Sequence, residues 1–81
     1  MIKYNKEAEK FIFTQNKATA IRLYNAIKKI PAGDIKKLRG THNPTLYRLR
    51  VGNFRVIYYY PEQDQITIVR IDNRGDVYKN L

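Results

Sequence analysis

Three arginines on two neighbouring segments are the first residues whose types and spacing indicate chemistry. Arg48 and Arg50 alternate with apolar residues in segment 47–51, and Arg55 follows the Gly-Asn pair at 52–53. Arginine stays protonated and presents a planar set of donors that suits bidentate contact with phosphate. Such residues cannot serve as a base, but they can bind a phosphodiester and stabilise charge that develops on it.

The turn Gly52-Asn53 fixes how these segments pair. Glycine in the first position of a two-residue turn is typical of a type II′ β-hairpin, and so short a loop sets the register. Arg50 is therefore predicted to face Arg55, with Arg48 diagonal to Arg55 on the same face. Like charges in direct opposition destabilise a sheet, so the cluster needs open solvent or an anion. The alternative is a solvated face whose arginine stems cover apolar surface.

Further residues extend this candidate site. No acidic residue occurs between positions 35 and 61, so no carboxylate close in sequence is expected to neutralise the cluster. Aromatic rings beside basic residues can stack on nucleotide bases. The residues predicted to contact RNA are Lys36, Lys37, Arg39, His42 and Tyr59.

Two groups near the site could transfer a proton. His42 lies in a Gly-Thr-His-Asn-Pro loop and is either a general base or an exposed loop residue. Tyr78 follows a glycine turn close to Asp76, and is either a proton-transfer group or a packing residue.

Composition narrows the function classes. The chain has 81 residues, of which 43% are hydrophobic, and its 16 Lys and Arg against 7 Asp and Glu give a net charge of +9. This charge indicates a polyanionic partner, or else serves solubility alone. With no cysteine and one histidine, a disulfide scaffold, a Cys-based zinc site and most His-based metal sites are excluded, and no cofactor is expected.

The hydropathy pattern predicts a soluble, cytoplasmic protein. No apolar run approaches the roughly 20 residues of a membrane span, and the first residues lack the apolar core of a signal peptide. We therefore expect no membrane partner.

The elements that position these residues follow from periodicity. A short strand is predicted at 1–4, and two helices follow with Asn5 and Asn16 as candidate N-caps. Pro31 and Gly33 stop the second helix. Segments 45–51, 54–60 and 66–71 have the β-type pattern and tight turns between them. The chain is thus predicted to be one α+β domain, 1–81, with an N-terminal strand, a helical hairpin and an antiparallel β-meander. The helices are expected to pack on one face of the sheet.

Three segments, 37–40, 47–58 and 71–79, resemble the RelE/ParE superfamily of bacterial type II toxins. Their order and the layout around them cover nearly the whole chain. The resemblance implies a compact toxin inhibited by an antitoxin protein. In the RelE branch, it implies a toxin that enters the ribosomal A site and cleaves mRNA. The positions that match the family's catalytic residues are Arg48, Arg50, Arg55, Arg74 and Tyr78.

The chain departs from the family pattern in two places. Some RelE members carry lysines where Arg48 and Arg50 stand, and many relatives carry a histidine where this chain has Asn73. The general base is therefore unassigned. The hypothesis is a metal-independent mRNA endoribonuclease that acts on the ribosome. The alternatives are a ParE-like inhibitor of DNA gyrase and a nucleic-acid-binding member of the same fold without catalysis.

Overall fold

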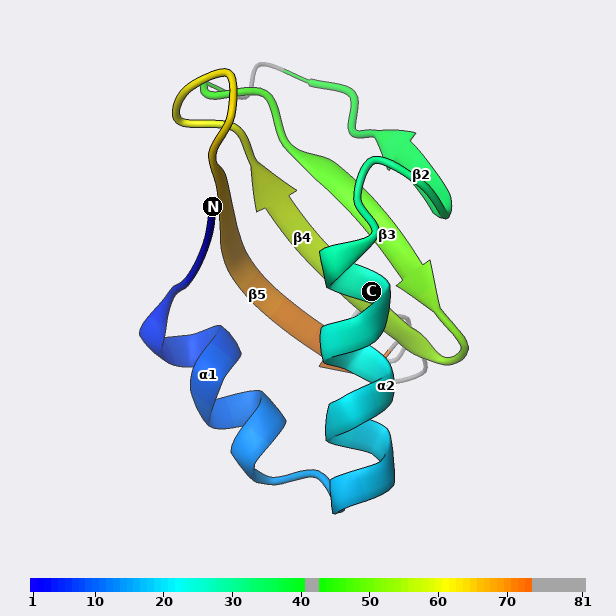
Figure 1. Ribbon diagram of the computed structural model, residues 1–81. Helices are drawn as coiled ribbons and strands as arrows, with labels where there is room; N and C mark the ends of the chain where they lie inside the picture. Colours follow the sequence, from blue (N-terminus) through cyan, green and yellow to red (C-terminus); the bar gives the residue numbers. More distant parts are fainter. Residues whose placement is uncertain (41–42, 74–81) are drawn as a thin grey trace.

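The computed structural model describes residues 1–40 and 43–73 (Figure 1). Its elements are β1 (Ile2–Tyr4), α1 (Lys6–Phe13), α2 (Lys17–Lys28), β2 (Asp34–Lys37), β3 (Tyr47–Val51), β4 (Phe54–Tyr59) and β5 (Ile66–Asn73). The predicted α+β order of a strand, a helical hairpin and a β-meander is confirmed. The bounds of the predicted strands differ by one or two residues, and β2 was not predicted.

Both helices begin at the predicted asparagines. Asn16 is the N-cap of α2, and its side-chain oxygen accepts a hydrogen bond of 2.8 Å from the backbone N–H of Thr19. Asn5 holds the N-cap position of α1 without a side-chain cap bond. Each helix buries an apolar stripe, with Ile12 from α1 and Leu23 from α2 in the core. Each helix therefore has one face that must pack against the sheet.

The sheet has the strand order β1-β5-β4-β3-β2. Strands β3, β4 and β5 form the predicted antiparallel meander. The unpredicted strand β2 pairs antiparallel with β3 and forms one edge, and β1 pairs in parallel with β5 at the other edge. The sheet is therefore mixed, and the segment after the helical hairpin contributes a fifth strand.

The hairpin of β3 and β4 has the register that the turn predicts. Arg50 lies opposite Arg55, and Val51 lies opposite Phe54. Gly52 has a φ of 60°, and none of the described non-glycine residues has a positive φ, which agrees with a type II′ turn. The hairpin therefore places alternate side chains on opposite faces as expected.

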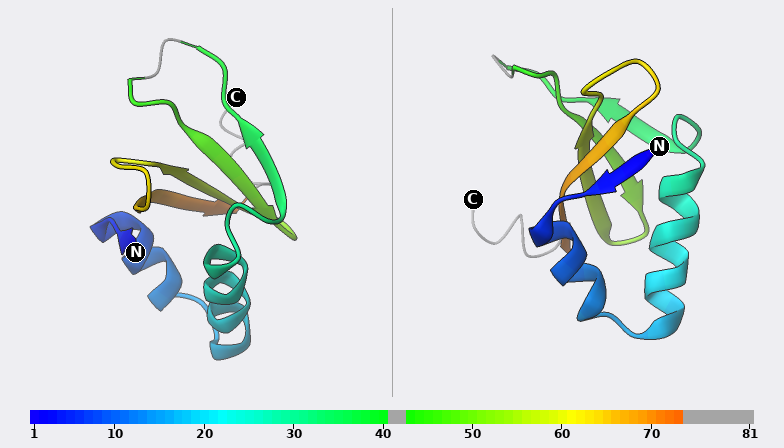
Figure 2. Two further views of the ribbon diagram at one scale, coloured as in Figure 1. Left: turned by 45° about the horizontal axis from the view of Figure 1, so that its top comes forward. Right: turned by 60° about the vertical axis from the view of Figure 1, so that its left-hand side comes forward.

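Helices α1 and α2 lie on the same side of the sheet, as Figure 1 and both views of Figure 2 show. The core between the two layers contains the buried side chains Ala8, Ile12, Leu23, Ile27, Leu49, Val51, Val56, Tyr58, Ile68 and Ile71. The far face of the sheet has no helix from the described residues over it. Neither α1 nor α2 is long and apolar enough to cross a membrane.

Candidate functional site

Arg48, Arg50 and Arg55 lie together on the sheet face that the helices do not cover, which we call the arginine face. Arg50 and Arg55 are directly opposed, and Arg48 lies opposite Ile57, so it is diagonal to Arg55. The core-facing residues of the same two strands are buried on the other side. Alternation along two strands of fixed register thus brings the three guanidinium groups to one surface.

Residues of the neighbouring strands complete this face. Lys36 on β2 lies opposite Arg48, and Arg70 on β5 lies opposite Ile57. Ile57 is apolar yet only 6% exposed, although it lies on the uncovered face. Its neighbours in the register are arginines, whose aliphatic stems can cover such a residue while their charged ends reach solvent. The arginine face therefore has an apolar floor beneath its cations.

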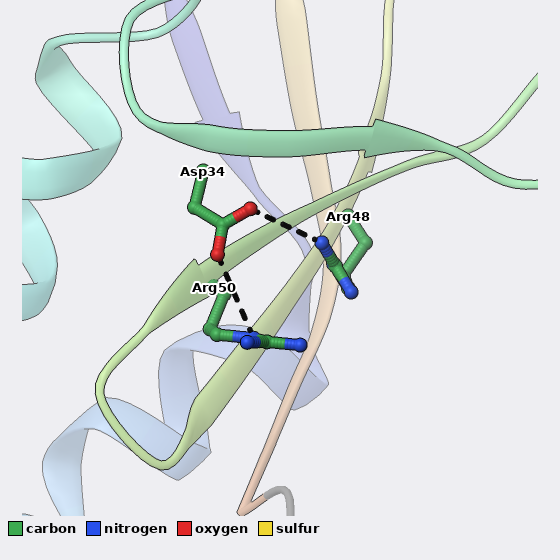
Figure 3. A network of polar contacts seen from close by, with 3 residues as sticks. All are labelled: Asp34, Arg48 and Arg50. Atoms are coloured by element: carbon green, nitrogen blue, oxygen red, sulfur yellow. Dashed lines mark hydrogen bonds and ion pairs between the residues drawn. The ribbon is translucent and has the colours of Figure 1, made fainter.

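The expectation that no carboxylate neutralises the cluster is wrong, because β2 brings Asp34 beside it (Figure 3). One oxygen of Asp34 lies 3.4 Å from Nη2 of Arg48, and the other lies 3.7 Å from Nε of Arg50. Asp34 stands one residue before the acid-free stretch 35–61. Sequence reasoning missed it because β2 was not predicted, and only strand pairing brings position 34 opposite position 50.

A second carboxylate, Asp72 on β5, lies opposite Arg55 in the register. Its side chain forms an ion pair of 3.0 Å with Nε of Arg70 and also accepts a hydrogen bond from Nη2 of Arg70. The described strands thus place five cations on this face, namely Lys36, Arg48, Arg50, Arg55 and Arg70, against the two carboxylates Asp34 and Asp72. The face keeps an excess of positive charge.

The guanidinium groups retain unused donor capacity. The Nε atoms of Arg48, Arg50 and Arg55 are buried, and none has a hydrogen-bond partner among the described residues. The 3.7 Å separation between Arg50 and Asp34 is an ion-pair distance that is too long for a hydrogen bond. Buried donors are normally satisfied in proteins. Three adjacent arginines with spare donors are suited to bind an oxyanion.

The remaining predicted contact residues are dispersed. Alternation places Tyr59, which is half-buried, on the arginine face with Arg55. Lys37 lies opposite Tyr47, so it belongs to the other face of β2. Arg39 lines a separate surface hollow of about 530 Å³ with Lys37, Leu38, Gly40 and Thr45. The predicted residues His42, Arg74 and Tyr78 lie outside the described part of the chain.

Tyr47, Tyr58 and Tyr60 form an aromatic cluster against the core rather than on the arginine face. The rings of Tyr47 and Tyr58 are stacked with centroids 5.5 Å apart, and Tyr60 contacts both edge-on. Burial raises the pKa of the Tyr58 hydroxyl, and the neighbouring Tyr60 raises it further. Tyr58 is fully buried, and the partly buried Tyr47 and Tyr60 pack against the core, so this aromatic cluster contributes to packing.

A groove that sequence reasoning missed lies between α2 and the β3–β4 hairpin. Its volume is about 610 Å³. It is lined by Ala18, Ile21, Arg22, Asn25, Ala26, Lys29, Ala32, Gly33, Leu49, Arg50, Val51 and Gly52. The lining contains three cations and no carboxylate, and Ile21 is 48% exposed. A signal was present in the sequence, since Ile21 is an apolar residue beside the buried stripe of its helix.

The fold is similar to that of chains in solved toxin–antitoxin complexes. The RelE–RelB complex of Pyrococcus horikoshii OT3 contains a chain that matches with a TM-score of 0.70 and 30% identity, over 91% of this chain and 93% of that chain. A chain of the RelB–RelE antitoxin–toxin complex of Methanococcus jannaschii matches with a TM-score of 0.74 and 26% identity, over 98% of both. The RelBE2 toxin–antitoxin complex of Mycobacterium tuberculosis, at 17% identity and a TM-score of 0.67, shares the fold.

The family is shown by sequence. Residues 2–78 match the family model of the ParE toxin of the type II toxin-antitoxin system, parDE. The chain therefore belongs to this toxin family, and the predicted membership of the RelE/ParE superfamily is confirmed. RelE1 of Methanocaldococcus jannaschii, which is named as a toxin, is 46% identical over 48 residues. That match covers 58% of this chain and 51% of RelE1, so the chain spans about half the length of this curated relative.

Proposed function

We propose that this toxin is an mRNA endoribonuclease that acts on the ribosome and stops translation, and that the arginine face binds the scissile phosphate. The observation that carries the proposal is the convergence of Arg48, Arg50 and Arg55, each with a buried Nε that has no hydrogen-bond partner among the described residues. Guanidinium groups in such an array can contact phosphate oxygens through paired hydrogen bonds. An RNA strand offers these oxygens at regular spacing.

The proposed reaction uses a nucleophile that RNA itself supplies. The ribose 2′-hydroxyl attacks the adjacent phosphorus, an O2′–P bond forms, and the P–O5′ bond breaks. The products are a 2′,3′-cyclic phosphate and a 5′-hydroxyl, so the proton lost from the 2′-oxygen is balanced by one gained at the 5′-oxygen. This step requires neither a metal nor a cofactor from the protein.

Each matched residue has a proposed role in that step. Arg50, Arg55 and Arg74 stabilise the negative charge that builds on the phosphate oxygens, which is often the largest single contribution to catalysis. Arg48 positions the RNA backbone. Tyr78 transfers a proton or stacks on the nucleotide. The ribosome supplies the orientation of the mRNA that a site with few catalytic groups lacks.

The similarity to chains of two RelE–RelB complexes, at 30% and 26% identity, supports the RelE branch. The second candidate is inhibition of DNA gyrase, and the observation that favours it is the match of residues 2–78 to a model described as a ParE toxin. Inducing the chain in cells and mapping mRNA ends by primer extension separates the two. The proposal expects new mRNA 5′-ends and arrested translation before any DNA damage response. A DNA damage response without new mRNA ends favours gyrase.

We also propose that a cognate antitoxin inhibits this chain by binding in the groove between α2 and the hairpin. Two similar structures are complexes of RelE with RelB. Arg22, Lys29 and Arg50 line the groove beside exposed Ile21, without a lining carboxylate. These features fit an acidic segment with one apolar face. Arg50 lines the groove and also carries its side chain on the arginine face, so the two surfaces adjoin at this residue.

A further inference from the structure

Asp34 is a carboxylate on the arginine face, where cations outnumber carboxylates. It lies opposite Arg50 on the edge strand β2, and Figure 3 shows its side chain directed toward Arg48 and Arg50. Its two oxygens contact different arginines, at 3.4 Å from Nη2 of Arg48 and 3.7 Å from Nε of Arg50. A phosphate that bound the same two guanidinium groups would need the space and the charge that this carboxylate now occupies.

These two contacts are loose. Charge-assisted N–H···O bonds are usually about 2.7–2.9 Å long, and both separations exceed that range. The side chain of Asp34 is 57% exposed, and exposed ion pairs contribute little to stability. Neither contact satisfies the buried Nε donors of Arg48 and Arg50. A better-placed oxyanion can therefore replace the carboxylate.

We propose that Asp34 is a displaceable counter-ion that occupies the phosphate position between Arg48 and Arg50 until RNA binds. In the free protein it reduces the repulsion between the two arginines. When RNA binds, the carboxylate swings aside and remains close to the phosphate, so it lowers the affinity of the site for every polyanion. On the ribosome, other contacts also hold the RNA and offset this loss of affinity. Free RNA lacks those contacts and is bound weakly. The inference rests on the proposed function.

The role is separable from the folding of β2. Backbone pairing with β3 extends over all four residues of the strand, and Ile35 packs against the core. Neither interaction uses the Asp34 carboxylate. Replacing it with an amide of nearly the same shape should therefore leave the strand in place.

The test is the affinity of the purified full chain for a single-stranded RNA whose riboses are 2′-O-methylated, so that binding is measured without cleavage. Asp34→Asn is expected to tighten binding about three- to tenfold at low salt, because one negative charge beside the phosphate is removed. The slope of log affinity against log salt should become steeper by up to about 0.7. Asp34→Glu, which keeps the charge, should bind within about twofold of the wild type.

Asp64→Asn is the matched control, since it makes the same charge change in the β4–β5 turn, at the other end of β4 from Arg55. It should alter affinity less than twofold. Weaker binding by Asp34→Asn, or an effect equal to that of Asp64→Asn, would overturn the proposal. Unchanged RNA affinity with lost cleavage would also overturn it and would assign Asp34 to proton transfer.

A parallel titration with inorganic tripolyphosphate separates this inference from the proposed function. If Asp34→Asn tightens tripolyphosphate binding but the wild-type chain cleaves no mRNA on ribosomes, the counter-ion role of Asp34 is supported and the nuclease proposal fails. If the wild type cleaves mRNA through its arginines and Asp34→Asn tightens binding of neither RNA nor tripolyphosphate, the nuclease proposal is supported and the counter-ion role of Asp34 is rejected.

Discussion

Arg50 on β3 and Arg55 on β4 are direct partners across an antiparallel ladder, on the face of the sheet away from the helices. Two like charges in this arrangement oppose the pairing of their own strands. The pairing persists because the same strands bury Leu49, Val51 and Val56 on the other side. Burial of these core side chains thus offsets the repulsion between Arg50 and Arg55.

The arrangement predicts a specific salt dependence. Arg50→Ala removes one phosphate contact, so its affinity for single-stranded RNA should fall and the slope of log affinity against log salt should decrease by about 0.7. Lys10→Ala removes the same charge from the last turn of α1, on the helix side. It should leave both quantities nearly unchanged. Equal effects of the two substitutions would indicate that net charge, rather than the arginine face, binds RNA.

The hairpin turn should be sensitive to a side chain at Gly52. Its φ of 60° favours glycine, and an added Cβ would lie 2.5 Å from Nη2 of Arg22. Gly52→Ala is therefore expected to lower the free energy of unfolding by about 1–2 kcal/mol, as measured by urea denaturation. Arg22 has a flexible side chain that can move away, so the backbone carries most of this cost. The destabilisation should persist in an Arg22→Ala background, and full rescue there would refute this explanation.

Alkaline pH should destabilise the protein through a tyrosine near the core. Burial, followed by the proximity of Tyr24, raises the pKa of Tyr4 to about 12 from an ordinary value of 10.0. Because the folded state holds this proton more tightly, the stabilisation is complete below about pH 10 and is lost as the pH rises toward about 12. Urea midpoints measured at pH 8 and pH 11 should therefore fall less in Tyr4→Phe than in the wild type. Identical losses would contradict the assignment.

The antitoxin proposal predicts that the groove can be disabled without unfolding the chain. Ile21→Glu adds a negative charge to an exposed position in the groove, so it should weaken binding of the neighbouring-gene product at least about tenfold by calorimetry. Phe13→Glu is the matched control, because Phe13 is 74% exposed and is not a groove residue. Stability should change by no more than about 0.5 kcal/mol in either variant. Equal loss of binding in both variants would place the antitoxin elsewhere.

The hairpin could be predicted from sequence because its determinants are local. Gly52-Asn53 sets the turn, alternation sets the faces, and the two together place Arg50 opposite Arg55. Strand β2 could not be predicted in this way. The run Asp34-Ile35-Lys36-Lys37 contains one apolar residue, and it becomes a strand because β3 offers it an edge. Tertiary context often overrides local preference in this way.

Because β2 was not predicted, the predicted site differed from the observed one more than the predicted fold did. Without β2, Asp34 has no reason to lie near Arg48 and Arg50, and the arginine cluster looks uncompensated. The parallel pairing of β1 with β5 was likewise not predicted, since it joins segments from the two ends of the described chain. Charge counts along a sequence therefore describe a strand face poorly until the partners of its strands are known.

Cleavage of mRNA on purified ribosomes tests the central claim most directly. The wild-type chain should generate new mRNA 5′-ends by primer extension, and Arg55→Ala should lower their rate of formation by about 100-fold or more while its circular dichroism spectrum stays native. Lys10→Ala should cleave at the wild-type rate. Cleavage by a folded Arg55→Ala protein at the wild-type rate would contradict a catalytic arginine face.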